Sequence, residues 1–130
     1  MPKRRSGHPT QAELEILNVL WRQGPGTVRS IHEALQADRR TALTTTLKII
    51  QYMEAKGLVV RSDGRPATYS PGVTQEGTQA GLLSDLLERA FGGSVRKLLV
   101  RAVEDARLSD EDYAELRKLI LKRRTKGGGI

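Results

Sequence analysis

The sequence contains no cysteine and only two histidines, His8 and His32. Disulfides, thiolate nucleophiles, iron–sulfur clusters and cysteine-based zinc sites are therefore excluded, and so is a histidine-rich metal site. The chain also lacks a nucleophile–base pair, a phosphate-binding loop and metal-ligand spacing. We therefore expect a protein that is not an enzyme and that uses no metal and no cofactor.

Long apolar runs are missing as well. No stretch approaches the roughly 18 apolar residues that a membrane-spanning helix needs, and no apolar segment follows the basic N-terminal residues as it would in a secretory signal. We expect a cytoplasmic protein with no membrane partner. Apolar residues form 38% of the 130 residues, which is enough for a modest core but leaves little for a deep catalytic cavity.

Negative charge is in short supply. The chain has 22 Lys and Arg against 15 Asp and Glu, a formal net charge of +7. Residues 1–71 carry 11 basic and 6 acidic residues, whereas residues 72–130 carry 11 and 9. This balance favours a polyanionic partner, nucleic acid or an anionic membrane surface, bound through the N-terminal half. A merely basic soluble protein is the alternative.

The first half of the chain begins with two helices that are marked by capping signals. Thr10 and Glu13 have the spacing of a capping box before a helix that runs to about Gln23. Thr27 is a second N-cap candidate, and a helix of about ten residues follows it.

A third helix and a hairpin complete this half. The periodicity predicts a helix over 42–56 that ends at Gly57. Two short strands, 58–61 and 67–70, follow, and the Asp63-Gly64 turn joins them. Three helices and a hairpin in this order predict a winged helix-turn-helix, in which the third helix enters the major groove and the hairpin lies along the DNA backbone.

Helix 42–56 has two contrasting faces at about 100° per residue. Its apolar arc contains Leu43, Thr46, Leu47, Ile49, Ile50 and Met53. Its other face is free of acidic residues and carries Thr44, Thr45, Lys48, Gln51 and Tyr52. Hydroxyls and a lysine can bind phosphates or base edges. An ordinary amphipathic helix with a solvated face is the alternative, and Arg61 and Arg65 of the hairpin are either phosphate contacts or solvated.

The second half of the chain is helical, with Pro71-Gly72 as the predicted junction. We expect a mostly α protein with a winged-helix DNA-binding domain at 1–71, a small helical dimerisation domain at 72–124 and a disordered tail at 125–130. The helices after Pro71 are rich in Leu and Val but too few to enclose a core, so self-association is the simplest way to bury them. Packing back onto the first domain is the alternative. The candidate interface residues are Leu82, Leu86, Leu98, Leu99, Val103, Leu116, Leu119 and Ile120.

Five segments of the chain occur together in a familiar order. They are Glu13-x-x-Ile16-Leu17-x-x-Leu20-Trp21, Thr27-Val28-Arg29, Ala42-Leu43-Thr44-Thr45-Thr46-Leu47, Lys56-Gly57-Leu58 and Gly64-Arg65-x-x-x-Tyr69-x-Pro71. Over residues 8–124 the chain resembles the penicillinase-repressor family, which are winged-helix repressors of the BlaI and MecI type. The resemblance implies a homodimer that binds a palindromic double-stranded DNA operator, one winged helix per half-site.

The resemblance also implies roles for particular residues. The pair that begins the recognition helix falls on Thr44 and Thr45, and the next groove-facing positions fall on Lys48 and Tyr52, where the family often has Thr and Arg. The wing glycine and arginine fall on Gly64 and Arg65. Together with the residues singled out above, the DNA-binding candidates are Thr44, Thr45, Lys48, Tyr52, Arg61 and Arg65.

Some members of the family are released from DNA by a regulatory protease that cuts the C-terminal domain after a membrane sensor detects β-lactam. Counted back from Leu108-Ser109, the corresponding bond is Arg101–Ala102, where the best-known site has Asn before an aromatic residue. A copper-responsive cysteine hook, known in some relatives, is excluded because the chain has no cysteine.

Two other functions stay open. The domain could serve as a winged-helix protein–protein interaction module, or as a general DNA-coating protein. Binding that falls steeply with salt and prefers one palindrome would distinguish a sequence-specific reader from both. The basic residues Lys3-Arg4-Arg5 are either an arm for the minor groove or a solvated tail. No sequence feature marks an effector pocket between the two domains.

Overall fold

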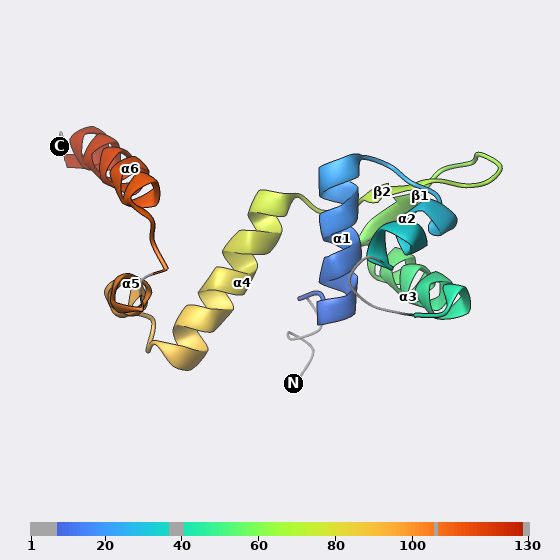
Figure 1. Ribbon diagram of the computed structural model, residues 1–130, viewed down its shortest axis with the longest axis horizontal. Helices are drawn as coiled ribbons and strands as arrows, with labels where there is room; N and C mark the ends of the chain where they lie inside the picture. The colour runs from blue at the N-terminus through green and yellow to red at the C-terminus, as the bar shows by residue number, and fades with distance from the viewer. Residues whose placement is uncertain (1–7, 37–40, 106, 129–130) are drawn as a thin grey trace. The chain divides into compact units, whose positions relative to one another are not determined.

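The structure is a computed structural model that describes residues 8–36, 41–105 and 107–128. It is mostly α, as predicted, and Figure 1 shows the elements in chain order. They are α1 (Gln11–Gln23), α2 (Val28–Leu35), α3 (Leu43–Lys56), β1 (Val59–Arg61), β2 (Tyr69–Pro71), α4 (Gln75–Ala90), α5 (Val95–Glu104) and α6 (Asp110–Gly128). The chain divides into two compact units, residues 1–83, here called the head, and residues 84–130, the C-terminal unit.

Local signals begin and end the helices of the head. The capping box before α1 is present in both directions: Glu13 N–H donates to Thr10 Oγ1 at 3.2 Å, and Thr10 N–H donates to Glu13 Oε1 at 2.9 Å. Thr27 accepts from Ser30 N–H in the same way before α2. Helix α3 ends at Gly57, whose φ of 83° is a conformation that favours glycine.

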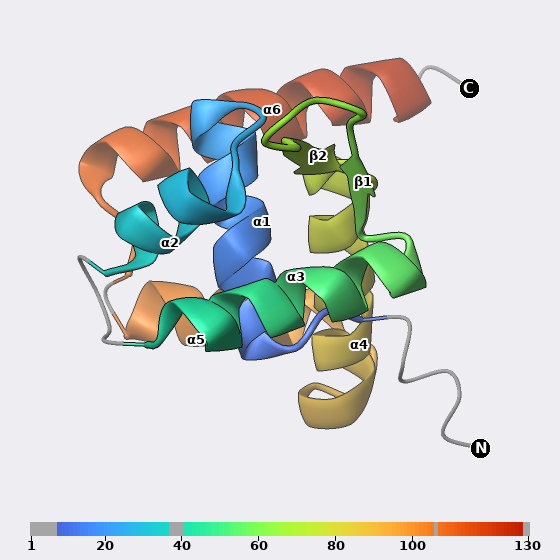
Figure 2. The ribbon, with the colours of Figure 1, turned by 90° about the vertical axis from the view of Figure 1, so that its right-hand side faces the viewer.

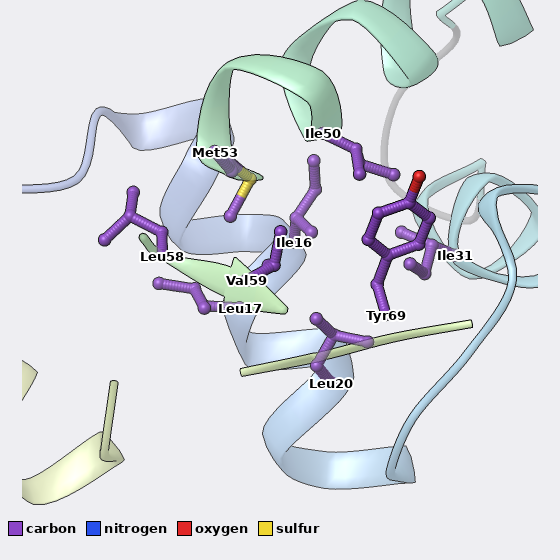
Figure 3. Close-up of a cluster of buried hydrophobic side chains, with 9 residues drawn as sticks. All are labelled: Ile16, Leu17, Leu20, Ile31, Ile50, Met53, Leu58, Val59 and Tyr69. Atoms are coloured by element: carbon purple, nitrogen blue, oxygen red, sulfur yellow. The ribbon is translucent and has the colours of Figure 1, made fainter. Parts of the chain in front are cut away.

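The core of the head joins all three helices to both strands. Nine buried side chains form it: Ile16, Leu17, Leu20, Ile31, Ile50, Met53, Leu58, Val59 and Tyr69. Figure 3 shows the ring of Tyr69 standing beside Ile31 and Ile50, so that the second strand closes the gap between α2 and α3. Burial of each such side chain stabilises the fold by roughly 1.5–3 kcal/mol. Ile50 and Met53 hold α3 in place through this core. Figure 2 shows α3 running across α1.

The two strands form an antiparallel ribbon in which Val59 pairs with Pro71 and Arg61 pairs with Tyr69. The sequence predicts a tight turn at Asp63-Gly64 and a second strand that ends at residue 70, and the structure differs from both predictions. Residues 62–68 form a longer loop that projects from the head in Figure 1, and Pro71 is the last residue of β2. Proline is tolerated there because β2 is at the edge of the ribbon.

Two long-range contacts brace this arrangement. Gly26 and Tyr69 exchange backbone hydrogen bonds of 3.1 and 2.7 Å, which attach the segment before α2 to the ribbon. Glu13, which is buried, accepts a charge-assisted bond of 2.6 Å from Lys56 Nζ and so ties the start of α1 to the end of α3. Three helices and a wing held in this way form a winged helix.

The C-terminal unit contains the end of α4, all of α5 and all of α6. Ser94 caps α5 by accepting from Lys97 N–H at 3.1 Å, and Ser109 and Asp112 bond each other's backbone before α6. The helix then continues to Gly128, past the predicted start of a disordered tail at residue 125, and Thr125 Oγ1 donates to the carbonyl of Leu121. The domain junction predicted at Pro71-Gly72 also differs from the compact units, because the head extends to Leu83.

Some expectations concern absences or lie outside the described ranges. Within these ranges no helix is both long and apolar enough to cross a membrane, and no group of acidic or histidine side chains is arranged to hold a metal ion. The basic residues Lys3-Arg4-Arg5 lie outside the residues that the structure describes.

Candidate nucleic-acid interface

Helix α3 separates its two faces sharply. Thr46, Ile50 and Met53 are almost completely buried, with exposed fractions of 1%, 0% and 0%. The apolar arc was predicted to include Leu43 and Leu47, but the structure leaves them 36% and 37% exposed. The core is narrower than the arc, because α1, α2 and β1 pack against α3 and leave these two leucines at the margin of the contact.

The opposite face of α3 is open. The four predicted groove-reading residues are all exposed, namely Thr44, Thr45, Lys48 and Tyr52. Tyr52, at 61% exposed, presents most of its ring to solvent. Lys48 forms no ion pair with any residue that the structure describes. A free cation between hydroxyl groups is a suitable surface for phosphates and for the acceptor atoms of guanine.

The wing adds a second basic edge to the head. Arg61 and Arg65 are both exposed, and neither is paired with an acid in the described part of the chain. The hydroxyl of Ser62 gives the loop its shape, because it accepts from the backbone N–H groups of Gly64 and Thr68 at 3.2 and 2.9 Å. Arg65 is therefore carried by an internally bonded loop, and Arg61 is the last residue of β1, where this loop begins.

The start of α3 is held by contacts with the end of α2 and the residue after it, and not by an N-cap side chain. Ala42 occupies the N-cap position and offers no side-chain bond. Instead Thr46 Oγ1 lies 2.9 Å from His32 Nδ1, and the amide nitrogen of Gln36 donates to the carbonyl of Thr41 at 3.1 Å. The same nitrogen lies 3.2 and 3.5 Å from the two ring nitrogens of His32, so these groups form one polar cluster between α2 and α3.

The sequence around His32 is polar and shows no partner for it, which predicts a surface residue, and this prediction is wrong. It is half-buried and bonded to α3. The signal that could have found this contact is Thr46, a polar residue in the middle of an apolar arc. A buried hydroxyl requires a hydrogen-bonding partner, and His32 on the preceding helix supplies it.

Replacing Thr46 with Val should lower the free energy of unfolding by about 1–2 kcal/mol, because it leaves His32 without its partner while conserving shape. Thr45→Val is the matched control, since Thr45 is exposed on the same helix and should change stability by less than about 0.5 kcal/mol. Urea denaturation of both variants measures the difference. Equal stabilities would show that the His32 bond contributes nothing.

The predicted dimer residues are distributed over both units. Leu82 lies in the head, and it is half-buried like Leu98 and Leu116. The others are largely open to solvent: Leu86, Leu99, Val103, Leu119 and Ile120, with exposed fractions between 40% and 57%. No side chain described between residues 84 and 125 is fully buried. Helices α5 and α6 enclose an apolar hollow of about 200 Å³ that Leu99, Val103 and Ile120 help to line.

The predicted cleavage bond lies inside a helix. Arg101 and Ala102 belong to α5, and Asp105 N–H donates to the Arg101 carbonyl at 3.0 Å. The guanidinium of Arg101 also pairs with Glu104 and Asp105. Proteases bind substrates as extended chains, so this bond is not presented for cleavage while α5 is intact.

A family model described as penicillinase repressor matches residues 9–122. The chain belongs to the penicillinase-repressor family. The resemblance seen in the sequence is therefore confirmed over nearly the whole chain. The family and the curated regulators similar to this chain also confirm the prediction that the protein is not an enzyme. They identify it as a winged-helix transcriptional repressor.

Several curated members of the penicillinase-repressor family are similar to this chain. The transcriptional regulator BlaI of Mycobacterium tuberculosis is 37% identical over 103 residues, which cover 77% of this chain and 75% of that protein. The methicillin resistance regulatory protein MecI of Mammaliicoccus sciuri is 24% identical, with 88% and 94% covered. The penicillinase repressor of Bacillus licheniformis is 21% identical, with 85% and 88% covered.

A solved structure supports the fold. The crystal structure of a transcriptional regulator from Thermotoga maritima aligns with a TM-score of 0.50 and 18% identity. The alignment covers 98% of this chain and 82% of that one.

Proposed function

We propose that the protein is a homodimeric repressor that binds an inverted-repeat DNA operator, with one head on each half-site. In this proposal α3 lies in the major groove and the wing follows the backbone. Thr44, Thr45, Lys48 and Tyr52 read the bases, whereas Arg61 and Arg65 bind phosphates. The observation that carries the proposal is the exposed, acid-free face of α3, whose opposite face is locked into the core.

The polar cluster behind α3 supports this assignment. A reading helix must be held within a fraction of an ångström of its productive position, and α3 has no N-cap side chain to hold it. The contacts of His32 with Thr46 and of Gln36 with Thr41 supply two tertiary attachments at this end of α3. Thr46 lies on the buried face of α3 and Thr41 precedes the helix, so neither contact occupies the reading face.

The exposed apolar side chains of the C-terminal unit support a dimer that binds two half-sites. Among the residues that the structure describes, fourteen large apolar side chains are exposed, and nine of them lie in the segment from Leu86 to Leu121. So many exposed apolar side chains on consecutive helices indicate an interaction site. A second copy is the simplest partner, since a closed dimer buries the same face of both chains.

Release of the operator by proteolysis at Arg101–Ala102 is the finer part of the proposal. A cut there divides α5 and so removes α6 from the dimer surface. Because the bond is helical, the last turn of α5 must unwind first. Mass spectrometry of the protein recovered from induced cells tests this. A fragment that ends at Arg101 supports the proposal, whereas induction with an uncut chain contradicts it.

The principal test is selection of bound DNA from a genomic fragment library at several salt concentrations. We expect enrichment of one inverted repeat and binding that falls log-linearly with salt. Salt-sensitive binding without a motif would instead indicate a general DNA-coating protein. No retention at low salt would indicate a protein–protein interaction module.

Lys48→Ala tests how α3 reads this operator. If Lys48 contacts a base, the variant should lose about 1–3 kcal/mol of binding free energy on the operator and should discriminate less at one position. Titrations against the operator and against an unrelated duplex of equal length measure this. An equal loss on both duplexes would make Lys48 a phosphate contact.

A further inference from the structure

The residues that join the wing to α4 are held against the head. We call Gly72, Val73 and Thr74 the connector. Gly72 N–H donates to the carbonyl of Leu58 at 2.8 Å. The side chain of Val73 packs against the core, and its carbonyl accepts a 3.2 Å bond from Trp21 Nε1. Three contacts therefore fix the connector to the rest of the head: the Gly72 N–H bond, the packing of the Val73 side chain and the bond to the Val73 carbonyl.

Helix α4 starts from this connector without any free residue in between. Thr74 accepts from Gly77 N–H through its hydroxyl at 3.0 Å and from Thr78 N–H through its carbonyl at 3.0 Å. These are the bonds of a helix N-cap. The first turn of α4 therefore has its direction set by the position of the connector.

Trp21 has a part in this arrangement that packing alone does not explain. Its ring is half-buried and packs beside the core. Its N–H, however, is directed at a residue 52 positions later in the chain. The Val73 carbonyl precedes the helix cap, so it has no partner within α4, and the indole N–H satisfies it.

We propose that Trp21 determines which half-site spacing the repressor accepts, by clamping the connector and thereby fixing the direction in which α4 begins. This inference rests on the proposed binding of two half-sites by a dimer. One base pair moves a half-site by about 3.4 Å and rotates it by about a tenth of a turn. A stiff connection between head and dimer tolerates such a displacement poorly, whereas a loose one tolerates a range of separations.

Trp21→Phe removes the N–H and keeps an aromatic ring. The experiment titrates the full-length wild type and this variant against operators with identical half-sites and with central spacers that differ by one base pair. For the wild type we expect one preferred spacing and a loss of about tenfold or more on either side of it. In the variant the loss of affinity at non-preferred spacings should be about fivefold smaller, because one hydrogen bond contributes about that factor to an equilibrium.

Lys56→Ala is the matched control, because it removes the ion pair with Glu13 from the head without touching the connector. It should lower stability and leave the spacing preference unchanged. Thr74→Gly is a second test variant, which loosens the start of α4 outside the core and should broaden the preference as Trp21→Phe does.

Three outcomes would overturn the inference. One is an unchanged spacing profile in both test variants, and another is a loss of affinity by Trp21→Phe that is equal at all spacings. A third is the same broadening in Lys56→Ala, which would assign the effect to stability. If the wild type binds no inverted repeat at any spacing, the proposed function fails first, and this result is distinct from the other three.

Discussion

Val103→Asp is expected to convert the proposed dimer into monomers and to remove most of its operator affinity. In the single chain Val103 is 57% exposed, so a carboxylate there is solvated and costs the fold little. In a dimer that covers the apolar hollow between α5 and α6, the same carboxylate is desolvated without a partner. That burial costs several kcal/mol, which is enough to dissociate a dimer at micromolar concentration.

The loss of DNA binding follows from the loss of the second head. Once one head of a dimer is bound, the other binds at high effective concentration, which strengthens the complex by about 10²- to 10⁴-fold. Val103→Asp should therefore bind the full operator at least about 100-fold more weakly. On a duplex that contains one half-site, the variant and the wild type should bind alike, because the head is unchanged.

Val60→Asp is the matched control for the oligomeric state. Val60 is 56% exposed and lies on β1 in the head, outside the proposed dimer surface. Sedimentation equilibrium should find this variant dimeric and Val103→Asp monomeric. A Val103→Asp chain that sediments as the wild type does would contradict a dimer built on α5 and α6.

The parts of the fold that could be predicted from the sequence are those with local signals. Thr10 and Glu13 are three residues apart, and their reciprocal bonds depend on nothing else in the chain. Gly57 ends α3 for an equally local reason, because its φ of 83° favours a residue without a side chain. Helix α3 and its open face could also be predicted, because the periodicity that separates the two faces is a local pattern.

What could not be predicted are the contacts between distant residues. Periodicity shows that Thr46 faces inward, but not that His32, 14 residues earlier, bonds it. It places Leu43 and Leu47 in the apolar arc, but only the packed neighbours decide how far the core extends along that arc. The unpredicted features therefore concern how α3 is positioned, whereas the prediction that it is the reading helix rests on a local pattern.

Gly72→Ala is expected to be the most damaging small substitution in the head. A Cβ at this position would lie 2.3 Å from the carbonyl oxygen of Gly57, and 3.3 Å from the Gly57 and Leu58 carbonyl carbons. These are backbone atoms that follow α3 and begin the wing, so no side chain can rotate away. Overpacking of this kind costs about 1–3 kcal/mol and occasionally more, and loss of the Gly72–Leu58 hydrogen bond adds about 1 kcal/mol.

The same substitution at Gly81 should have the opposite sign. Gly81 lies in α4, and a Cβ there would meet only His8 at an ordinary contact distance of 3.5 Å. Alanine favours a helix interior over glycine by about 0.5–1 kcal/mol, so Gly81→Ala should be neutral or stabilising. Thermal unfolding of both variants compares them directly. Equal melting temperatures would show that the connector yields at Gly72, and a connector that yields could not hold α4 in a fixed direction.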